Sequence, residues 1–312
     1  MLNKFAILTD SFCELNEEIR KFYEIDFIPG HFIDSDGNQG ELNLNWDFST
    51  KQDFYSKISK DIDFYKTSPA NVEEIRQKFE FYVSKGIEIF CVTISSAISG
   101  TYNFFLLAKK QILQKYPNAK IEILDSRRYG HAHGLMCVHA SEMRFQGKGF
   151  SEVCEYFKEN FNNYHQCGWL DDLSFVAKKG RISNSKAFFG QLVGIKPIGE
   201  FDDNGLTTIL GNVKGEKFAF RVCLDYIESS ILDAKNQTII IGCSQREKQA
   251  QLFKSMIEEK FHPKKILMSD VFCGCGINVG PGLMSVYYAG TPISKGLEVE
   301  KTLFSELIEK NK

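Results

Sequence analysis

The sequence lacks the glycine patterns of nucleotide-binding enzymes. No G-x-G-x-x-G follows the first apolar run, which continues as Thr9-Asp10-Ser11, so a dinucleotide finds no glycine turn there. No G-x-x-x-x-G-K-[ST] occurs in the 312 residues. The segment Gly242 to Arg246, GCSQR, lacks the second glycine of a nucleophile elbow. These absences argue against hydride transfer, NTP hydrolysis and α/β-hydrolase chemistry.

An excess of charge of one sign is also missing. The formal net charge is -2, with basic and acidic residues interspersed, so the chain offers no broad basic face to a polyanion. No stretch approaches the ~20 apolar residues of a membrane helix, and the opening MLNKFAILTDSF reads as a short strand rather than a signal sequence. We therefore expect a cytoplasmic protein without a nucleic-acid partner.

A metal-binding cysteine pattern is absent as well. Seven of the nine cysteines are scattered singly through apolar or mixed segments, which is typical of small, buried, reduced thiols. The close pair Cys273-Gly-Cys275 lacks the two-residue spacing and the second ligand pair of a zinc site. We predict neither a metal nor a cofactor.

What the sequence does contain is an alternation of short apolar runs with longer amphipathic stretches. This order is typical of βα units on a mainly parallel sheet, and so of an α/β fold. The predicted strands are 5–8, 24–28, 88–94, 120–124, 237–242 and 264–268. The predicted helices are 71–84, where Asn71 precedes Glu73 and Glu74, 100–116 and 134–146.

The pattern changes after Asn162, which favours a second domain. A helix-like piece ends near Gly194, and two short strands then flank the turn Asp203-Asn204-Gly205. We predict an N-terminal α/β domain over residues 1–162 and a C-terminal α/β domain with a mixed sheet over residues 163–312. No long linker separates them, so the cleft between the domains is the expected ligand site.

Small hydroxyl residues gather where the predicted strands end. The segment ISSAISGTYN follows one strand, with Ser95 or Ser99 placed to cap the next helix, and Thr67 and Ser68 precede another capped helix. The carboxyl ends of parallel strands collect ligands, and a helix N-terminus with added hydroxyls can bind an anion. Simple helix capping explains the pattern about equally well.

The order of several motifs resembles that of the DegV family of fatty-acid-binding proteins. The resemblance spans residues 7–287. It rests on TDS, KTSPANVEE, ISSAISGTYN, LDS, KKGRIS, IKPI and GPG in this order. It implies two α/β domains that hold one long-chain fatty acid between them and present its carboxylate to a fatty-acid kinase, which supplies phosphate from ATP. Transient contact with a membrane is compatible with that role.

The resemblance also implies roles for individual residues. Those expected at the carboxylate, or at its glycine-rich surroundings, are Thr67, Ser68, Ser95, Ser96, Gly100, Asn278 and Gly280. Those expected along the acyl chain are Phe188, Phe189, Leu192 and Val193, which a plain core helix explains as well. Arg181 and Lys214 are expected to contact the kinase, although Arg181 could instead brace the domain interface.

Two segments depart from the family pattern. Asn278, in NVGPG, stands where the family usually has a histidine that binds the carboxylate. In VKGEKFAF, Lys214 and Lys217 are kept, but Glu216 and Phe218 occupy positions that are usually basic. The first departure concerns the head group of the ligand, and the second concerns docking of the kinase.

Two other functions stay open at this point. One is an enzyme that acts on a small carboxylate or phosphate in the same cleft, using Asp10, Asp125 or His133. The other is a lipid sensor without a kinase partner, which the altered basic segment favours. A non-catalytic carrier is the interpretation that the motifs favour most. The remaining histidines are expected on the surface or hydrogen-bonded in the core.

Overall fold

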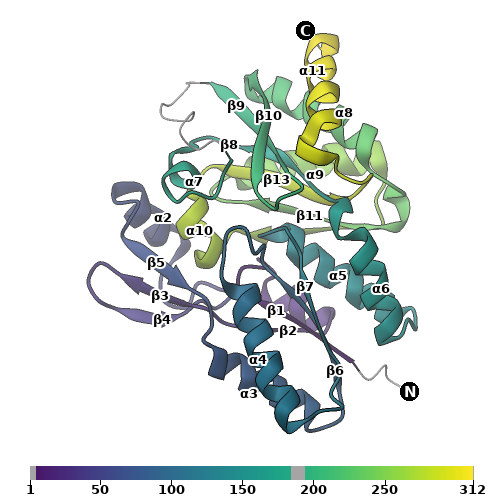
Figure 1. The fold of residues 1–312 in the computed structure, drawn as a ribbon. Coiled ribbons are helices and arrows are strands. Elements are labelled where there is room, and N and C mark those ends of the chain that lie inside the picture. The colour runs from purple at the N-terminus through teal and green to yellow at the C-terminus, as the bar shows by residue number, and fades with distance from the viewer. Residues whose placement is uncertain (1–4, 184–193, 312) are drawn as a thin grey trace.

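A computed structural model describes residues 5–183 and 194–311. Four parallel strands form its first sheet, in the order β2-β1-β6-β7 (Figure 1). Their bounds are Phe5–Asp10 for β1, Ile25–Ile28 for β2, Glu88–Thr93 for β6 and Ile121–Asp125 for β7. The predicted parallel sheet is therefore confirmed. Each of its predicted strands begins and ends within two residues of the corresponding observed strand.

Helices cover both faces of this sheet, and each of its central strands β1 and β6 accordingly contains a run of four apolar residues. On one face lie α3 (Val72–Val83) and α4 (Thr101–Lys115). On the other lie α1 (Glu17–Phe22), α5 (His131–Phe145) and α6 (Phe150–Asn160). The predicted start of α3 is confirmed, because the side chains and amides of Asn71 and Glu74 form a capping box.

Six strands form the second large sheet, in the order β10-β9-β8-β13-β11-β12. Their bounds are β8 Tyr164–Leu170, β9 Ile195–Phe201, β10 Thr207–Lys214, β11 Thr238–Cys243, β12 Lys265–Asp270 and β13 Leu283–Ala289. Only β11 and β12 pair in parallel, so the sheet is mixed, as predicted. Its outer face carries α8 (Glu216–Ser230), α9 (Glu247–Phe261) and α11 (Glu298–Asn311).

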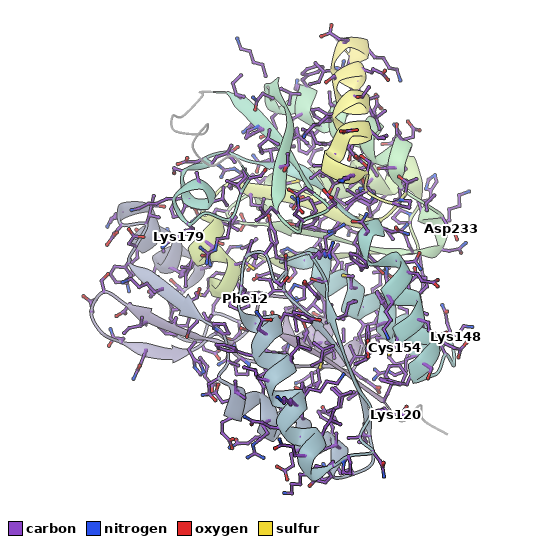
Figure 2. The ribbon with its side chains drawn as sticks, viewed as in Figure 1. Phe12, Lys120, Lys148, Cys154, Lys179 and Asp233 are labelled. Carbon is purple, nitrogen blue, oxygen red and sulfur yellow. The ribbon has the colours of Figure 1, made fainter. Side chains whose placement is uncertain are left out.

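Helix α5 joins the two halves of the molecule. It packs against β1 and β6 of the first sheet and against β8, β11 and β13 of the second, and 11 of its 15 residues are buried. A helix buried on nearly all sides belongs to a common core, here continuous from one sheet to the other. Figure 2 shows Phe12 within the ribbon between the sheets, and Lys120 and Lys148 on the outside. None of the helices among residues 5–183 and 194–311 is long and apolar enough to span a bilayer.

A small antiparallel sheet lies beside these layers, and the sequence analysis missed it. Its order is β4-β3-β5, with β3 His31–Asp34, β4 Gln39–Glu41 and β5 Tyr65–Ser68. These strands are short and mostly exposed or half-buried, and they lack a run of apolar residues. Helix α2 (Lys51–Lys60) and α10 (Cys273–Val279) pack together there, and α10 also contacts β5 and α7 (Ser174–Lys178).

The proposed domain boundary falls where the chain passes from the first large sheet to the second. The 3-10 turn Phe161–Asn163 precedes β8, and other such turns occur at Ala234–Asn236 and Lys295–Leu297. The division at residues 162 and 163 stays a prediction, because α10 returns to the first half and the core crosses α5. The residues predicted along an acyl chain, Phe188, Phe189, Leu192 and Val193, lie outside the described residues.

Candidate functional site

Two adjoining cavities lie where the large sheets, α7 and α10 meet. The apolar cavity lies above the inner face of the second sheet, and the polar cavity lies at the end of the first. The five residues that line both cavities form what we call the neck: Tyr129, Val176, Arg181, Cys275 and Val279. A single extended ligand could therefore occupy both.

The floor of the apolar cavity is a row of small residues that crosses the second sheet. Strand register places Gly199, Gly168, Ser285 and Gly242 side by side on β9, β8, β13 and β11. The first three line the cavity, while the ring of His131 lies over Gly242. A Cβ atom on Gly168 would lie 2.1 Å from the carbonyl oxygen of Met284, so only glycine fits there. At Gly199 the methyl group of Thr207 likewise lies 2.9 Å from the place of a Cβ atom, so the row is closely packed by its neighbours.

The polar cavity begins at the carboxyl ends of β1 and β6. The buried Asp10 carboxylate accepts hydrogen bonds from the amides of Phe12 (3.0 Å) and Ile94 (2.7 Å), and both of these residues line the cavity. This position is the expected one for a ligand of a parallel α/β sheet. The carboxylate of Asp10 thus holds two neighbouring strand ends in place behind the cavity wall.

Four of the residues predicted at a carboxylate line this polar cavity together. Thr67 and Ser68 come from β5, Gly100 precedes α4, and Asn278 lies on α10. The Asn278 amide donates to the carbonyl oxygen of Gly274 at 3.2 Å. The predicted set is therefore brought into one place from three distant segments, with hydroxyl and amide donors available to an anion.

The other three predicted residues lie outside the cavity linings. Ser95 is buried and its hydroxyl donates to the carbonyl oxygen of Gly205 at 2.9 Å. Ser96 is exposed and donates to the carboxylate of Asp125 at 2.5 Å. The Gly280 carbonyl accepts a hydrogen bond from Ser244 at the turn before β13.

Of the three serines in this loop, Ser99 is the one at the cavity, and Ser95 and Ser96 are not. It lines the polar cavity, and its hydroxyl forms a 2.8 Å hydrogen bond with that of Thr101 in the first turn of α4. The sequence analysis offered Ser99 only as a helix cap. Its role in the lining depends on how the loop after β6 turns, which the local pattern of serines does not determine.

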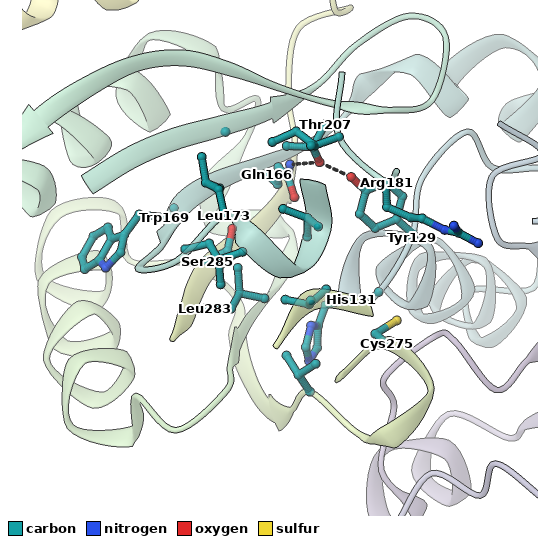
Figure 3. A pocket seen from close by; sticks show the side chains of 18 of the residues that line it. Tyr129, His131, Gln166, Trp169, Leu173, Arg181, Thr207, Cys275, Leu283 and Ser285 are labelled. Atoms are coloured by element: carbon teal, nitrogen blue, oxygen red, sulfur yellow. Dashed lines mark hydrogen bonds between the residues drawn. The ribbon is translucent and has the colours of Figure 1, made fainter. Parts of the chain in front are cut away.

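The two residues predicted to contact a kinase lie in different places. Arg181 lines both cavities at the neck, and in Figure 3 its guanidinium points away from the other labelled side chains. Lys214 is exposed at the end of β10 and lines neither cavity. Lys217 lies on α8, on the opposite face of the second sheet from the apolar cavity.

A chain of polar side chains runs from the neck into the apolar cavity, and the sequence analysis missed it. The hydroxyls of Tyr129 and Thr207 share a hydrogen bond, and the Gln166 amide bonds the Thr207 oxygen at 2.7 Å (Figure 3). The three residues come from the loop before α5, from β10 and from β8. Since they are far apart in the sequence, no local spacing could have indicated that they meet.

Two ionisable residues beside the apolar cavity are strongly affected by burial. Burial raises the pKa of the Glu14 carboxyl to about 8, although the amides of Phe272 and Cys275 at the start of α10 donate to it. Burial lowers the pKa of His131 to about 4, so this imidazole is neutral near pH 7. The His131 Nε2 atom lies 3.0 Å from the carbonyl oxygen of Asp270.

The residues considered for an enzyme, Asp10, Asp125 and His133, are not among those that line the cavities. His133 is buried, with its Nε2 atom 3.1 Å from the Thr9 hydroxyl and 3.4 Å from Asp10, and Asp125 binds Ser96. None of these acidic or imidazole groups is among the described residues that line either cavity. His31, His139 and His165 also have hydrogen-bond partners, in agreement with the expected structural roles.

One cluster has donor atoms suited to a cation. Cys243, Glu247 and Asp270 hold ligand atoms within 4.8 Å of one another. The ammonium group of Lys51 forms 2.5 Å ion pairs with both carboxylates, so a positive charge already lies between them. We therefore assign no metal ion to this cluster.

Comparison with known proteins places the chain in a family. A sequence profile described as an uncharacterised protein of the DegV family matches residues 4–291. The chain belongs to the DegV family. A DegV domain-containing protein of Clostridium perfringens is 32% identical over 289 residues, which cover 93% of this chain and 98% of the relative. A second such protein, of Streptococcus pyogenes serotype M1, is 27% identical over 287 residues, 92% of this chain and 98% of its own.

Solved structures of DegV proteins share the fold. A DegV lipid-binding protein from Thermotoga maritima superposes with a TM-score of 0.79 at 21% identity, over 93% of this chain and 99% of the other. The fatty acid kinase B3 protein of Streptococcus pneumoniae, loaded with linoleic acid, gives 0.77 at 20% identity, over 92% and 99%. A fatty-acid-binding DegV protein from Thermus thermophilus gives 0.80 at 20% identity, over 92% and 99%. The predicted two-part α/β architecture is therefore confirmed.

Proposed function

We propose that this DegV protein binds one long-chain fatty acid across both cavities and presents its carboxylate to a fatty-acid kinase. The observation that carries the proposal is the pairing of a cavity rich in hydroxyl and amide donors with an apolar one through a common neck. The carboxylate would accept hydrogen bonds from Thr67, Ser68, Ser99 and Asn278. The chain would pass Val176 and lie on the row of small residues.

The apolar cavity provides the larger share of the binding energy. About fifteen chain carbons at roughly 0.8 kcal/mol each could supply on the order of 10 kcal/mol before the costs of ordering the chain. The hydrogen bonds of the polar cavity mainly orient the head group, and each bond to a charged group adds about 1.5–3 kcal/mol. This division suits a carrier that must hold the chain while the carboxylate stays reachable.

The protein itself would act as a carrier in the cytoplasm, without a cofactor. The kinase would transfer the terminal phosphoryl group of ATP to the carboxylate, giving an acyl phosphate and ADP. The resemblance in fold to the kinase-associated B3 protein of Streptococcus pneumoniae supports such a partner. Arg181, at the neck, is placed to meet either the partner or the transferred phosphate, since a guanidinium binds both carboxylates and phosphates.

Native mass spectrometry of the purified protein tests the proposal. A carrier is expected to retain one fatty acid, which organic extraction releases as a single long-chain species. Addition of a fatty-acid kinase and ATP should then convert this acid to the acyl phosphate. A protein that is empty as purified and binds neither palmitate nor oleate would contradict the proposal, and turnover of a small carboxylate without any kinase would favour an enzyme instead.

A further inference from the structure

In the wall of the apolar cavity, the side-chain amide of Gln166 forms a hydrogen bond within the described part of the chain at only one of its two polar atoms. Gln166 lies on β8 with 8% of its surface exposed, and its side chain faces the cavity. Its Nε2 atom donates to the Thr207 hydroxyl at 2.7 Å, and its backbone amide donates to the Glu200 carboxylate at 2.9 Å. Among residues 5–183 and 194–311, no group bonds the other end of the side-chain amide, Oε1.

The hydroxyl groups nearest this amide already have partners. Tyr287, which lies opposite Gln166 on β13, bonds Ser285, and Thr207 shares a hydrogen bond with Tyr129. Elsewhere the cavity lining includes the apolar side chains of Leu173, Pro197 and Leu283. Gly199 lies beside the amide, where a Cβ atom would be 3.7 Å from Nε2 but only 2.9 Å from the methyl group of Thr207. Thr207 thus packs closely over Gly199 next to the amide.

A second polar group lies on the same floor. The Ser285 hydroxyl lines the cavity, lies 3.5 Å from the carbonyl oxygen of Val286 and forms a hydrogen bond with the Tyr287 side chain. Gln166 and Ser285 lie on the adjacent strands β8 and β13. Of these two polar groups on the floor, the Gln166 oxygen is the one without a partner among the described residues.

A plain hydrocarbon chain is a poor match for such a floor. It would displace water from the Gln166 oxygen without replacing the hydrogen bond, and an unpaired buried polar group is costly. A ligand hydroxyl would donate to Oε1 and remove that cost. A binding site that forms a hydrogen bond with a ligand hydroxyl discriminates strongly against ligands that lack this hydroxyl.

We propose that the ligand of this protein is a long-chain fatty acid that carries a hydroxyl group part-way along its chain, recognised by Gln166. This inference rests on the proposed fatty-acid function and names its ligand more narrowly. Tyr129 belongs to the neck, and Gln166 lies two hydrogen bonds further into the apolar cavity. The hydroxyl therefore belongs beyond the neck, on a mid-chain carbon rather than beside the carboxylate.

Competitive binding to the full-length wild-type protein tests this inference. Stearate is compared with its 2-, 10- and 12-hydroxy derivatives in a fluorescence displacement assay. At least one mid-chain isomer should bind about tenfold more tightly than stearate, and the 2-hydroxy isomer should show no such advantage. Tight binding of stearate with no preference for a mid-chain isomer would overturn the inference and leave the fatty-acid function standing. Failure of all four acids to bind would overturn both.

A pair of variants assigns the preference to the amide. Gln166→Met keeps the length of the side chain and removes its polar end, so the mid-chain preference should disappear while stearate binds as well or better. Leu283→Met changes the same cavity without changing a polar group, and should keep the preference. A preference that survives in folded Gln166→Met would overturn the role of Gln166. If that variant does not fold, the wild-type comparison still decides the nature of the ligand.

Discussion

Thr67 and Asn278 line the same polar cavity from opposite ends of the chain. Thr67 belongs to the small sheet, on β5, and Asn278 belongs to α10, which packs against that strand. A carboxylate held between them would be contacted by both halves of the molecule at once. Binding of the ligand is therefore expected to stabilise the contact between α10 and the small sheet.

Thr67→Val should weaken binding of a fatty acid about tenfold, because a hydrogen bond between a hydroxyl and a charged group contributes roughly 1.5–3 kcal/mol. Valine has nearly the shape of threonine, so thermal unfolding should change little. Ser96→Ala is the matched control, since Ser96 binds Asp125 and lies outside both cavity linings. Displacement of a fluorescent fatty acid measures both. Equal losses in the two variants would place the carboxylate elsewhere.

Val176→Trp should block the neck between the cavities. Val176 lines both of them and is half-buried, so a larger ring there closes the passage without disturbing the core. We expect the affinity for palmitate to fall at least a hundredfold and the melting temperature to stay close to that of the wild type. Val176→Ala widens the neck and should bind palmitate nearly as the parent does. Unchanged binding in Val176→Trp would mean that one ligand does not span both cavities.

Arg181→Glu should reduce the yield of acyl phosphate with a fatty-acid kinase more than it reduces binding of the acid. The guanidinium lies at the neck and points away from the apolar cavity, so reversing its charge should affect the partner or the phosphate rather than the chain. Lys214→Glu is the matched charge reversal and should have the smaller effect, because Lys214 lines neither cavity. Equal losses of binding and yield in Arg181→Glu would assign this residue to the pocket.

Asn278→His should make fatty-acid binding depend on pH. An asparagine amide carries no charge between pH 6 and 8, whereas a histidine beside a carboxylate has a raised pKa and is cationic at the acid end. The variant should therefore bind more tightly near pH 6, by on the order of 1 kcal/mol, and approach the parent near pH 8. Calorimetry at several pH values compares the two. Identical profiles would show that position 278 does not touch the head group.

The free energy of unfolding should fall as the pH rises from about 6.5 to 8, because of Glu14. Its folded pKa of about 8 exceeds the ordinary value of 4.5, so the native state holds a proton that the unfolded state has released. The stabilisation is fully present below pH 4.5 and is lost as the pH rises through 8. The slope is at most about 1.4 kcal/mol per pH unit. His131 titrates only below 6.5, outside this range.

Glu14→Gln is the test of that slope. Its side chain is neutral at every pH and keeps one oxygen, which can accept from the amide of Phe272 or from that of Cys275; these two amides donate to different oxygens of Glu14. Urea unfolding between pH 6.5 and 8 should give a flat profile for this variant and a falling one for the wild type. Parallel profiles would mean that Glu14 is ionised throughout the range.

The sequence by itself determined the local elements and the family. Caps and periodicity act over a few residues, so Asn71 with Glu74 marked the start of α3, and the apolar runs marked the parallel strands. The turn Asp203-Asn204-Gly205 likewise predicted the hairpin of β9 and β10. The order of the motifs indicated the DegV family and four of the residues that line the polar cavity.

Only the tertiary structure decided which polar groups meet. Ser95, Ser96 and Ser99 look alike in the sequence, yet the turn after β6 sends one to Gly205, one to Asp125 and one to the cavity. The row that includes Gly168 and Gly199 likewise exists only through the register of neighbouring strands. A shift of one residue would turn every side chain of a strand to the opposite face, and this register is set by long-range packing that no local pattern records.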